Sequence, residues 1–403
     1  MHLYALPLLF ALAGLIFYMV LGGADFGVGW WQLVAARRRR DARLREHLHH
    51  AIAPVWEANH VWLIFVLTVV WTAYPVAFES IATTLSIPLF IAVVGIVLRG
   101  TAYALRSGSF DADEVRPVDT VFSLSSILTP FALGAAVGGV ASRRVPVGNA
   151  AGSLFSSWLN PTSILIGTLA VAASAYLAAV FLAADTARIG DRGLEEDFRA
   201  RALGAGFLAG AIALGGIAVL HSDAHPLFHR LVEGRGIAAL VVSVAAGLGT
   251  LALVAARRYE PARYSAALAV AAIVAGWALA QSPLLLRGLT VEQAAASHDT
   301  LVAVVIAVVA GGVVLFPSLA LLFRLVLRGT FDLHEAESTS APGGGDLLLA
   351  SRARLLGRLA GASLLGGIGF LTIADAGWAH AIGAVCLFAF VIFGYPAALP
   401  ADM

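Results

Sequence analysis

Long, continuous runs of apolar residues dominate this chain, and each run has about the length that crosses a lipid bilayer. A membrane-spanning helix needs about 20 mostly apolar residues. The strands of a membrane β-barrel instead alternate polar and apolar residues over about ten positions, and these runs show no such alternation. The pattern therefore predicts an all-α protein that crosses the membrane many times.

Composition excludes the soluble and the disordered alternatives. Of the 403 residues, 60% are hydrophobic and only 13% are charged, whereas a soluble domain carries about 25% charged residues. A disordered chain needs low hydrophobicity. The formal net charge of +1 argues against nucleic acid as a partner. The single cysteine, Cys386, permits neither an internal disulfide nor a thiolate metal cluster.

The apolar stretches predict about nine to eleven spans, which we expect to be arranged as two four-helix bundles with a peripheral C-terminal helix or helices. The first stretch continues through Asp25 to Trp30, so we interpret it as a retained span, because a signal-peptide core is shorter. A further apolar region, 355–396, is either one interrupted span or two short ones. The nine clear candidates are 5–34, 51–73, 79–104, 118–140, 161–184, 202–220, 237–256, 264–282 and 300–327.

Three segments of the chain follow from this pattern. Residues 1–328 are predicted to form the main membrane domain. Residues 329–353, which include three consecutive glycines, are predicted to be a flexible cytoplasmic linker. Residues 354–403 are predicted to add one or more C-terminal membrane segments.

Arginine residues are distributed unevenly between the two sets of linkers, and this predicts the orientation. Twenty of the 26 arginines belong to alternate linkers, and six of them lie between residues 37 and 45. Cytoplasmic loops carry an excess of basic residues. The N-terminus is therefore predicted to face outward and the Arg-rich loops to face the cytoplasm.

Asp25, Glu57 and Arg99 are ionisable residues inside predicted spans, where a charge costs several kcal/mol unless it is paired or hydrated. Asp25 lies in a glycine-rich part of span one, and Glu57 lies near the start of span two. Counted at about 1.5 Å per residue from the shared loop, both carboxyl groups lie at a similar depth in the cytoplasmic half. Arg99 lies at the level needed to pair with either of them.

Two interpretations of these acids remain open. Two carboxyl groups at one depth can hold a proton and pass it on, since low dielectric lets them titrate near neutral pH. Alternatively, the three charges form an ion-pair network that only fixes helix packing. Trp56, Asn59 and His60 lie beside Glu57 and are expected to support it. His60 by itself is expected to be a hydrogen-bonded interior residue, and no metal ligand or complete catalytic site is assigned.

Several motifs together resemble subunit II of the cytochrome bd-type quinol oxidases. They are Gly23-Ala24-Asp25-Phe26-Gly27, Pro54-Val55-Trp56-Glu57-Ala58-Asn59-His60-Val61-Trp62-Leu63, Leu98-Arg99-Gly100, Trp277-Ala278-Leu279-Ala280-Gln281-Ser282-Pro283 and Pro317-Ser318-Leu319. The motif that opens span two is specific, and together the motifs cover about the first 330 residues. Glu57 stands where an aspartate is more usual in this family.

The resemblance implies a function and partners for the chain. Members pair with a larger subunit I, which holds b-type haems, a d-type haem and the quinol-oxidising loop, in the bacterial plasma membrane. The complex oxidises quinol and reduces dioxygen to water. Subunit II itself is expected to bind no haem, and the sequence leaves open a small accessory subunit. Asp25 and Glu57, with Arg99 and Trp56 beside them, are implied to be part of a proton path from the cytoplasm.

Two other functions fit the buried acids. A proton-coupled secondary transporter also carries acids and an arginine near a glycine-interrupted helix. A purely structural assembly subunit could use the same acids as packing groups. Purification with a haem-bearing partner distinguishes the oxidase subunit from the transporter.

Overall fold

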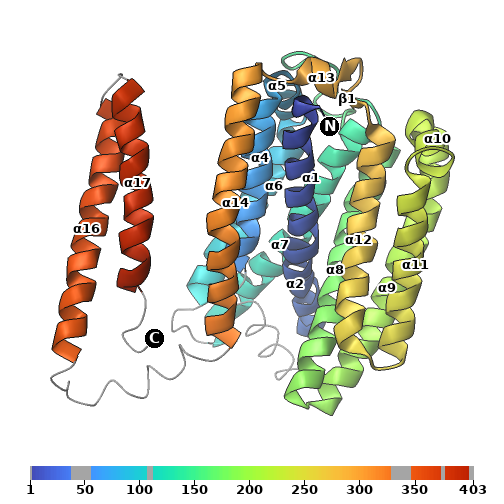
Figure 1. Cartoon of the computed structure of the whole chain (residues 1–403). Helices are drawn as coiled ribbons and strands as arrows, with labels where there is room; N and C mark the ends of the chain where they lie inside the picture. Colours follow the sequence, from blue (N-terminus) through green and yellow to red (C-terminus); the bar gives the residue numbers. More distant parts are fainter. Residues whose placement is uncertain (1, 38–55, 107–111, 328–345, 374–376, 399–403) are drawn as a thin grey trace. The chain divides into compact units, whose positions relative to one another are not determined.

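The protein is described by a computed structural model that covers residues 2–37, 56–106, 112–327, 346–373 and 377–398 (Figure 1). Within these ranges, eight helices are long and apolar enough to cross a membrane. Three shorter apolar helical segments, Asn59–Ala73, Leu355–Gly367 and Ile382–Gly394, accompany them. The expected all-α, multi-pass class is confirmed.

The chain divides into two compact units, Met1–Gly312 and Val313–Met403. The elements of the first unit, with the helix that continues past its end, are η1 (Leu3–Ala5), α1 (Leu6–Phe17), η2 (Tyr18–Gly22), α2 (Gly23–Arg37), α4 (Trp56–Ala73), α5 (Pro75–Thr84), α6 (Ser86–Arg106), α7 (Ala112–Ala141), α8 (Pro161–Ile189), α9 (Arg192–Asp223), α10 (His225–Val232), α11 (Ile237–Ala255), α12 (Tyr259–Gln281), β1 (Leu284–Leu286), β2 (Leu289–Thr290), α13 (Val291–Ala294) and α14 (His298–Leu327).

The first predicted span is helical throughout but not uniform. Helices α1 and α2 are joined by η2, a π-helical turn of five residues. Such a turn widens the helix and is frequent at functional sites. Asp25 lies three residues beyond Gly22, the last residue of the turn, so the irregular backbone closely precedes the buried acid.

Helices α7 and α8 are the most enclosed membrane spans of the first unit, and the alanine-rich sequence of α8 explains its close packing. Helix α8 packs against α2 and α7 and also against α9 and α12. Small side chains let helix backbones approach closely. At Gly27 of α2, an added Cβ atom would meet the backbone carbonyl of Ser174 in α8. The two helices are therefore in direct backbone contact beside Asp25.

Capping residues mark both ends of α8. Asn160 is the N-cap residue and its side chain accepts a hydrogen bond from the backbone N–H of Ser163 at 2.9 Å, which satisfies a donor that the helix leaves free. Gly190 ends the helix with φ 81°, a left-handed conformation that favours glycine.

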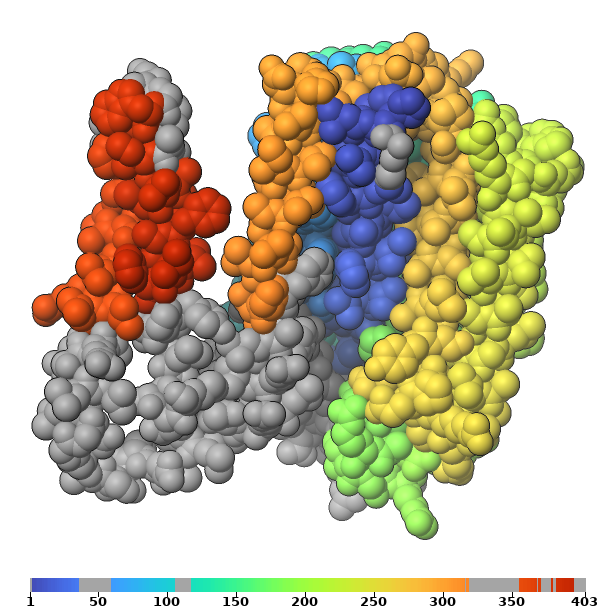
Figure 2. All heavy atoms as spheres, viewed as in Figure 1, coloured from blue at the N-terminus to red at the C-terminus, as the bar shows by residue number. Residues whose placement is uncertain are grey.

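The helices of the first unit lie side by side with their long axes roughly aligned (Figure 1). Helices α6 and α7 pack together, as do α1 and α4, and α11 and α12. In the space-filling view α1 reaches the surface beside α12 (Figure 2). The expected division into two four-helix bundles stays a prediction, since α8 packs against four other helices, α2, α7, α9 and α12.

A short connection joins α12 to α14 at the end of the unit that holds the N-terminus (Figure 1). Strands β1 and β2 pair antiparallel, and Gly288 in their turn has φ 81°. The one-turn helix α13 follows, with a capping box between Thr290 and Gln293. Leu286 and Leu289 are buried in an apolar cluster with Tyr74.

The second unit contains two helices beyond α14, namely α16 (Asp346–Ile373) and α17 (Gly377–Ala398), which pack against each other. Two helices therefore occupy the apolar region 355–396, for which one interrupted span was the alternative. Helix α16 begins at Asp346, inside the segment 329–353 that was expected to be a linker. The boundary between the units falls within α14 rather than at 328, and the predicted three-part organisation stays a prediction.

Candidate functional site

Asp25 and Arg99 form a buried ion pair between α2 and α6. Arg99 Nη1 donates to Asp25 Oδ2 and Arg99 Nη2 donates to Asp25 Oδ1, both at 2.7 Å. Arg99 Nη2 also donates to the backbone carbonyl of Asp25 at 3.2 Å. The exposed fractions of the two side chains are 2% for Arg99 and 6% for Asp25. A bidentate, charge-assisted pair of this kind is among the strongest polar contacts in proteins.

Helix α7 completes the surroundings of Arg99. Arg99 Nε donates to Ser126 Oγ at 2.9 Å, and Ser126 Oγ donates onward to the carbonyl of Phe122 at 2.6 Å. The guanidinium also lies 4.9 Å from the ring centroid of Phe26 and 4.8 Å from that of Phe122. Because every nitrogen of the guanidinium has a partner and two rings lie against it, its orientation is closely constrained.

The π-helical turn η2 adds a polar contact from α4. Asn59 Nδ2 donates to the carbonyl of Leu21 at 3.3 Å, which satisfies a backbone oxygen in the irregular turn. The rings of Tyr18, Phe26 and His60 meet edge to face, with centroids 6.1–6.3 Å apart. Tyr18 Oη and Asn59 Oδ1 are buried, and within the described residues no hydrogen-bond partner is found for them. Buried polar atoms of this kind are commonly satisfied by water.

The structure brings some of the predicted site residues together and leaves others outside its description. Asp25 and Arg99 are in contact, and Asn59 and His60 lie on the neighbouring helix against η2. Glu57 and Trp56 belong to the first turn of α4, but their side chains lie outside the described residues. The similar depth of Asp25 and Glu57 therefore stays a prediction.

Sequence reasoning missed three residues that complete the pair's surroundings. Ser126 and Phe122 come from α7, and no sequence pattern predicts that they contact Arg99. Tyr18 could have been noticed because it is a tyrosine within an otherwise apolar run seven residues before Asp25. Seven residues are about two helical turns, which places two side chains on one face.

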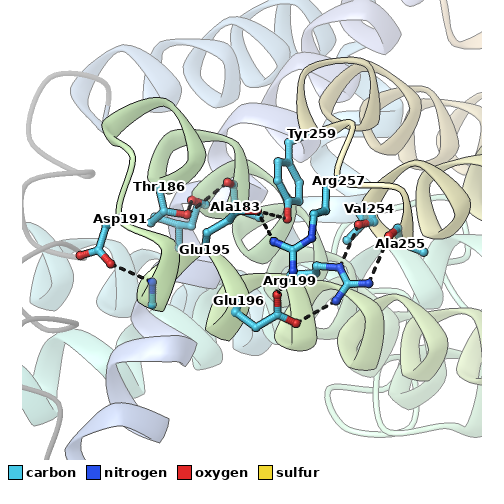
Figure 3. A network of polar contacts seen from close by, with 12 residues as sticks. Ala183, Thr186, Asp191, Glu195, Glu196, Arg199, Val254, Ala255, Arg257 and Tyr259 are labelled. Atoms are coloured by element: carbon cyan, nitrogen blue, oxygen red, sulfur yellow. Dashed lines mark hydrogen bonds and ion pairs between the residues drawn. The ribbon is translucent and has the colours of Figure 1, made fainter.

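A second polar network joins helix ends at the opposite end of the first unit from α10 (Figure 3). Arg257 Nη1 donates to Glu195 Oε1 at 2.8 Å and its Nη2 donates to Glu196 Oε2 at 2.5 Å. Tyr259 Oη donates to Glu195 Oε1 at 2.8 Å, and Arg199 Nη1 donates to Glu196 Oε1 at 2.8 Å. The hydrogen bond to Glu195 raises the pKa of Arg257. The network fastens the start of α9 to the connection between α11 and α12.

Comparison with known proteins identifies the family. Residues 3–326 match the profile of the family described as "Cytochrome bd terminal oxidase subunit II", which is more than three-quarters of the 403 residues. The chain belongs to the cytochrome bd terminal oxidase subunit II family. The matched region ends within α14, so α16 and α17 lie beyond it.

Individual relatives of the family agree with this assignment over shorter stretches. The chain is 29% identical over 127 residues to the cytochrome bd ubiquinol oxidase subunit 2 of Bacillus subtilis, covering 31% of this chain and 37% of the relative. It is 24% identical over 167 residues to the cytochrome bd-I ubiquinol oxidase subunit 2 of Escherichia coli, covering 39% and 42%. The chain thus spans less than half the length of these two curated relatives.

A solved structure shows the same fold. One chain of the bd oxidase from Geobacillus thermodenitrificans superposes with a TM-score of 0.68 at 23% identity, covering 81% of this chain and 99% of that chain. The family match and the apolar helices together identify a multi-pass bacterial membrane protein.

Proposed function

We propose that the chain is the non-haem subunit of a bd-type terminal oxidase, which transfers electrons from quinol to dioxygen and forms quinone and water. In this role it scaffolds a haem-bearing subunit I and contributes a cytoplasmic proton path through Glu57 and Asp25. The observation that most supports this proposal is the buried Asp25–Arg99 pair within a chain whose residues 3–326 match the family.

The proposed complex divides its tasks between the subunits. Subunit I holds the b-type and d-type haems and binds quinol, and these groups supply the electron transfer and the reduction of dioxygen. We assign no haem ligand to this chain, since His60 packs against the rings of Tyr18 and Phe26. The task of this chain is then to hold its partner and to deliver protons.

The proposed path follows α2 from the cytoplasmic side. Helix α2 runs from Gly23 to Arg37, where the Arg-rich segment begins, and Asp25 lies near its buried end. Its two carboxylate oxygens already accept hydrogen bonds from Arg99. Proton uptake at Asp25 would neutralise the carboxylate and weaken its contact with Arg99, and the buried hydroxyl of Tyr18 lies on the same part of the span.

The proposed orientation keeps the N-terminus outside the cytoplasm. It rests on the distribution of arginine between the linkers. The network of Arg257, Glu195 and Glu196 would then lie at the cytoplasmic end of the helices, and α10 at the outer end (Figure 1).

Two substitutions by neutral residues test the proposed proton path. Asp25→Asn and Glu57→Gln keep side-chain size and remove the titratable group, so we expect oxygen consumption by the intact complex to fall about tenfold or more. Glu79→Gln, at an exposed acid in α5, is the matched control and should keep wild-type turnover. Wild-type turnover in both test variants would overturn the proposed proton path.

Purification of the protein distinguishes the proposed function from the alternatives. A transporter that uses the same acids should purify alone and without colour, whereas the proposed oxidase subunit should purify with a haem-bearing partner and its absorbance bands. The family match favours the oxidase subunit. A purely structural role predicts that the two substitutions lower the yield of complex and leave the turnover per complex unchanged.

A further inference from the structure

Three arginines gather at the end of the first unit that holds the N-terminus, α10 and β1 (Figure 1). Arg143 follows α7, with φ 60° and a backbone hydrogen bond from its N–H to Val140 O at 3.0 Å. Arg230 lies in α10, and its Nη1 donates to Ser282 O at 3.4 Å. Arg287 lies in the turn between β1 and β2. The three side chains come from separate parts of the chain.

Apolar packing holds these elements together beneath the arginines. Ala141 at the end of α7, Leu227 in α10 and Ala280 near the end of α12 belong to one buried cluster. Leu231 and Trp277 pack against this cluster. This packing brings together α7 and α10, which lead to or carry Arg143 and Arg230, and it includes α12, which leads into the β1–β2 hairpin that carries Arg287. The packing offsets the mutual repulsion of the like charges.

Among the described residues, these three arginines differ from the neighbouring Arg144 in their ion pairing. The adjacent Arg144 is neutralised, because its guanidinium donates to both carboxylate oxygens of Asp223 at 2.7 Å and 3.0 Å. Over the described ranges, no carboxylate lies within 4.0 Å of the guanidinium of Arg143, Arg230 or Arg287. Partial burial lowers the pKa of Arg143, and the charges of Arg230 and Arg287 lower it further. An anion at this position would relieve the repulsion.

The cluster lies where the apolar helices end. Helix α7 ends at Ala141 and α12 ends at Gln281. Leu279 of α12 and Ile237 at the start of α11 are exposed apolar side chains on the neighbouring surface. Lipid phosphates lie at the level where spanning helices end, and acyl chains lie alongside the helices. A guanidinium group donates two parallel hydrogen bonds to a phosphate.

We propose that Arg143, Arg230 and Arg287 bind the phosphate of an anionic phospholipid headgroup in the leaflet on the side of the N-terminus. The phosphate oxygens accept hydrogen bonds from the three guanidinium groups, and the acyl chains lie over Leu279 and Ile237. This site is independent of the proton path, so either assignment can fail without the other.

The test measures lipid bound to the intact complex. The complex is purified in detergent with added phosphatidylglycerol, and bound lipid is counted by mass spectrometry for wild type, for Arg143→Gln and Arg230→Gln, and for the triple Gln variant. Each single substitution should weaken retention about tenfold, since it removes charge-assisted hydrogen bonds, and the triple variant should retain none. Arg235→Gln, at an exposed arginine near the same end, is the matched control and should retain wild-type amounts.

Further arms separate the possible sources of the anion and guard against misfolding. Arg230→Lys keeps the charge and should retain most of the lipid. High salt should release phosphatidylglycerol from the wild type. Inorganic phosphate that displaces the lipid at equal concentration, or phosphatidylcholine that binds as well, would overturn the assignment to an anionic lipid. So would a triple variant that keeps its lipid, or one that loses subunit I while its lipid count is unchanged.

Discussion

Arg99 holds both carboxylate oxygens of Asp25 at 2.7 Å, and its remaining nitrogen, Nε, donates to Ser126 across the helix interface. Three helices, α2, α6 and α7, are thereby joined through one guanidinium group. Both charged side chains are almost completely buried. The stability of this part of the protein and the proposed conduction of protons therefore depend on the same contact.

Removing the cation alone should destabilise the protein. Arg99→Gln leaves the Asp25 carboxylate buried without its partner, and a broken buried pair costs about 3–5 kcal/mol. We expect a lower thermal midpoint and a lower yield of complex. Arg235→Gln removes an exposed arginine and should leave both unchanged. Equal midpoints for the two variants would show that Arg99 does not carry this stabilisation.

Close backbone contact between α2 and α8 should make Gly27 intolerant of larger residues. In Gly27→Val the new side chain would meet the carbonyl of Ser174 and the Cβ atom of Ala178. Overpacking of this kind costs about 1–3 kcal/mol, and it would displace the helix that carries Asp25. Thermal unfolding in detergent measures the loss. Gly210→Val, at a helical glycine with open space around it, should be nearly neutral, and a similar loss there would contradict the packing argument.

The two glutamates of the network at the starts of α9 and α12 should contribute unequally to the stability of the protein. Glu195 accepts hydrogen bonds from both Arg257 and Tyr259, and its side chain is 14% exposed, whereas that of Glu196 is 51% exposed. Exposed ion pairs are screened by solvent and contribute little. Glu195→Gln should therefore lower the thermal midpoint more than Glu196→Gln does. The opposite order, measured at the same salt concentration, would contradict this assignment.

The sequence predicts the spans well and the neighbours of each buried residue poorly. Continuous apolar runs are sufficient to locate membrane helices, because length and hydrophobicity decide insertion. The level of Arg99 in span three also indicates that it can reach an acid in the first hairpin. Arg99 pairs with Asp25 and contacts Phe122 and Ser126 because of how each helix is rotated about its long axis. Packing of whole faces sets that rotation, and no short motif records it.

The π-helical turn is a second feature that the sequence does not reveal. Tyr18–Gly22 reads as ordinary apolar helix, yet it forms the wider turn. A tertiary partner supports the turn, since Asn59 from α4 donates a hydrogen bond to the carbonyl of Leu21. The clustering of Arg143, Arg230 and Arg287 is likewise absent from the sequence pattern, because their positions are far apart along the chain.

The most direct test of the proton path is oxygen consumption by the complex that carries both Asp25→Asn and Arg99→Gln. Replacing both members of a buried pair with neutral groups removes the penalty of an unpaired charge, so this double variant should assemble better than Arg99→Gln alone. If Asp25 passes protons, the assembled double variant should still reduce oxygen about tenfold or more slowly than wild type. Wild-type turnover in the assembled double variant would contradict the account and leave the pair a structural brace.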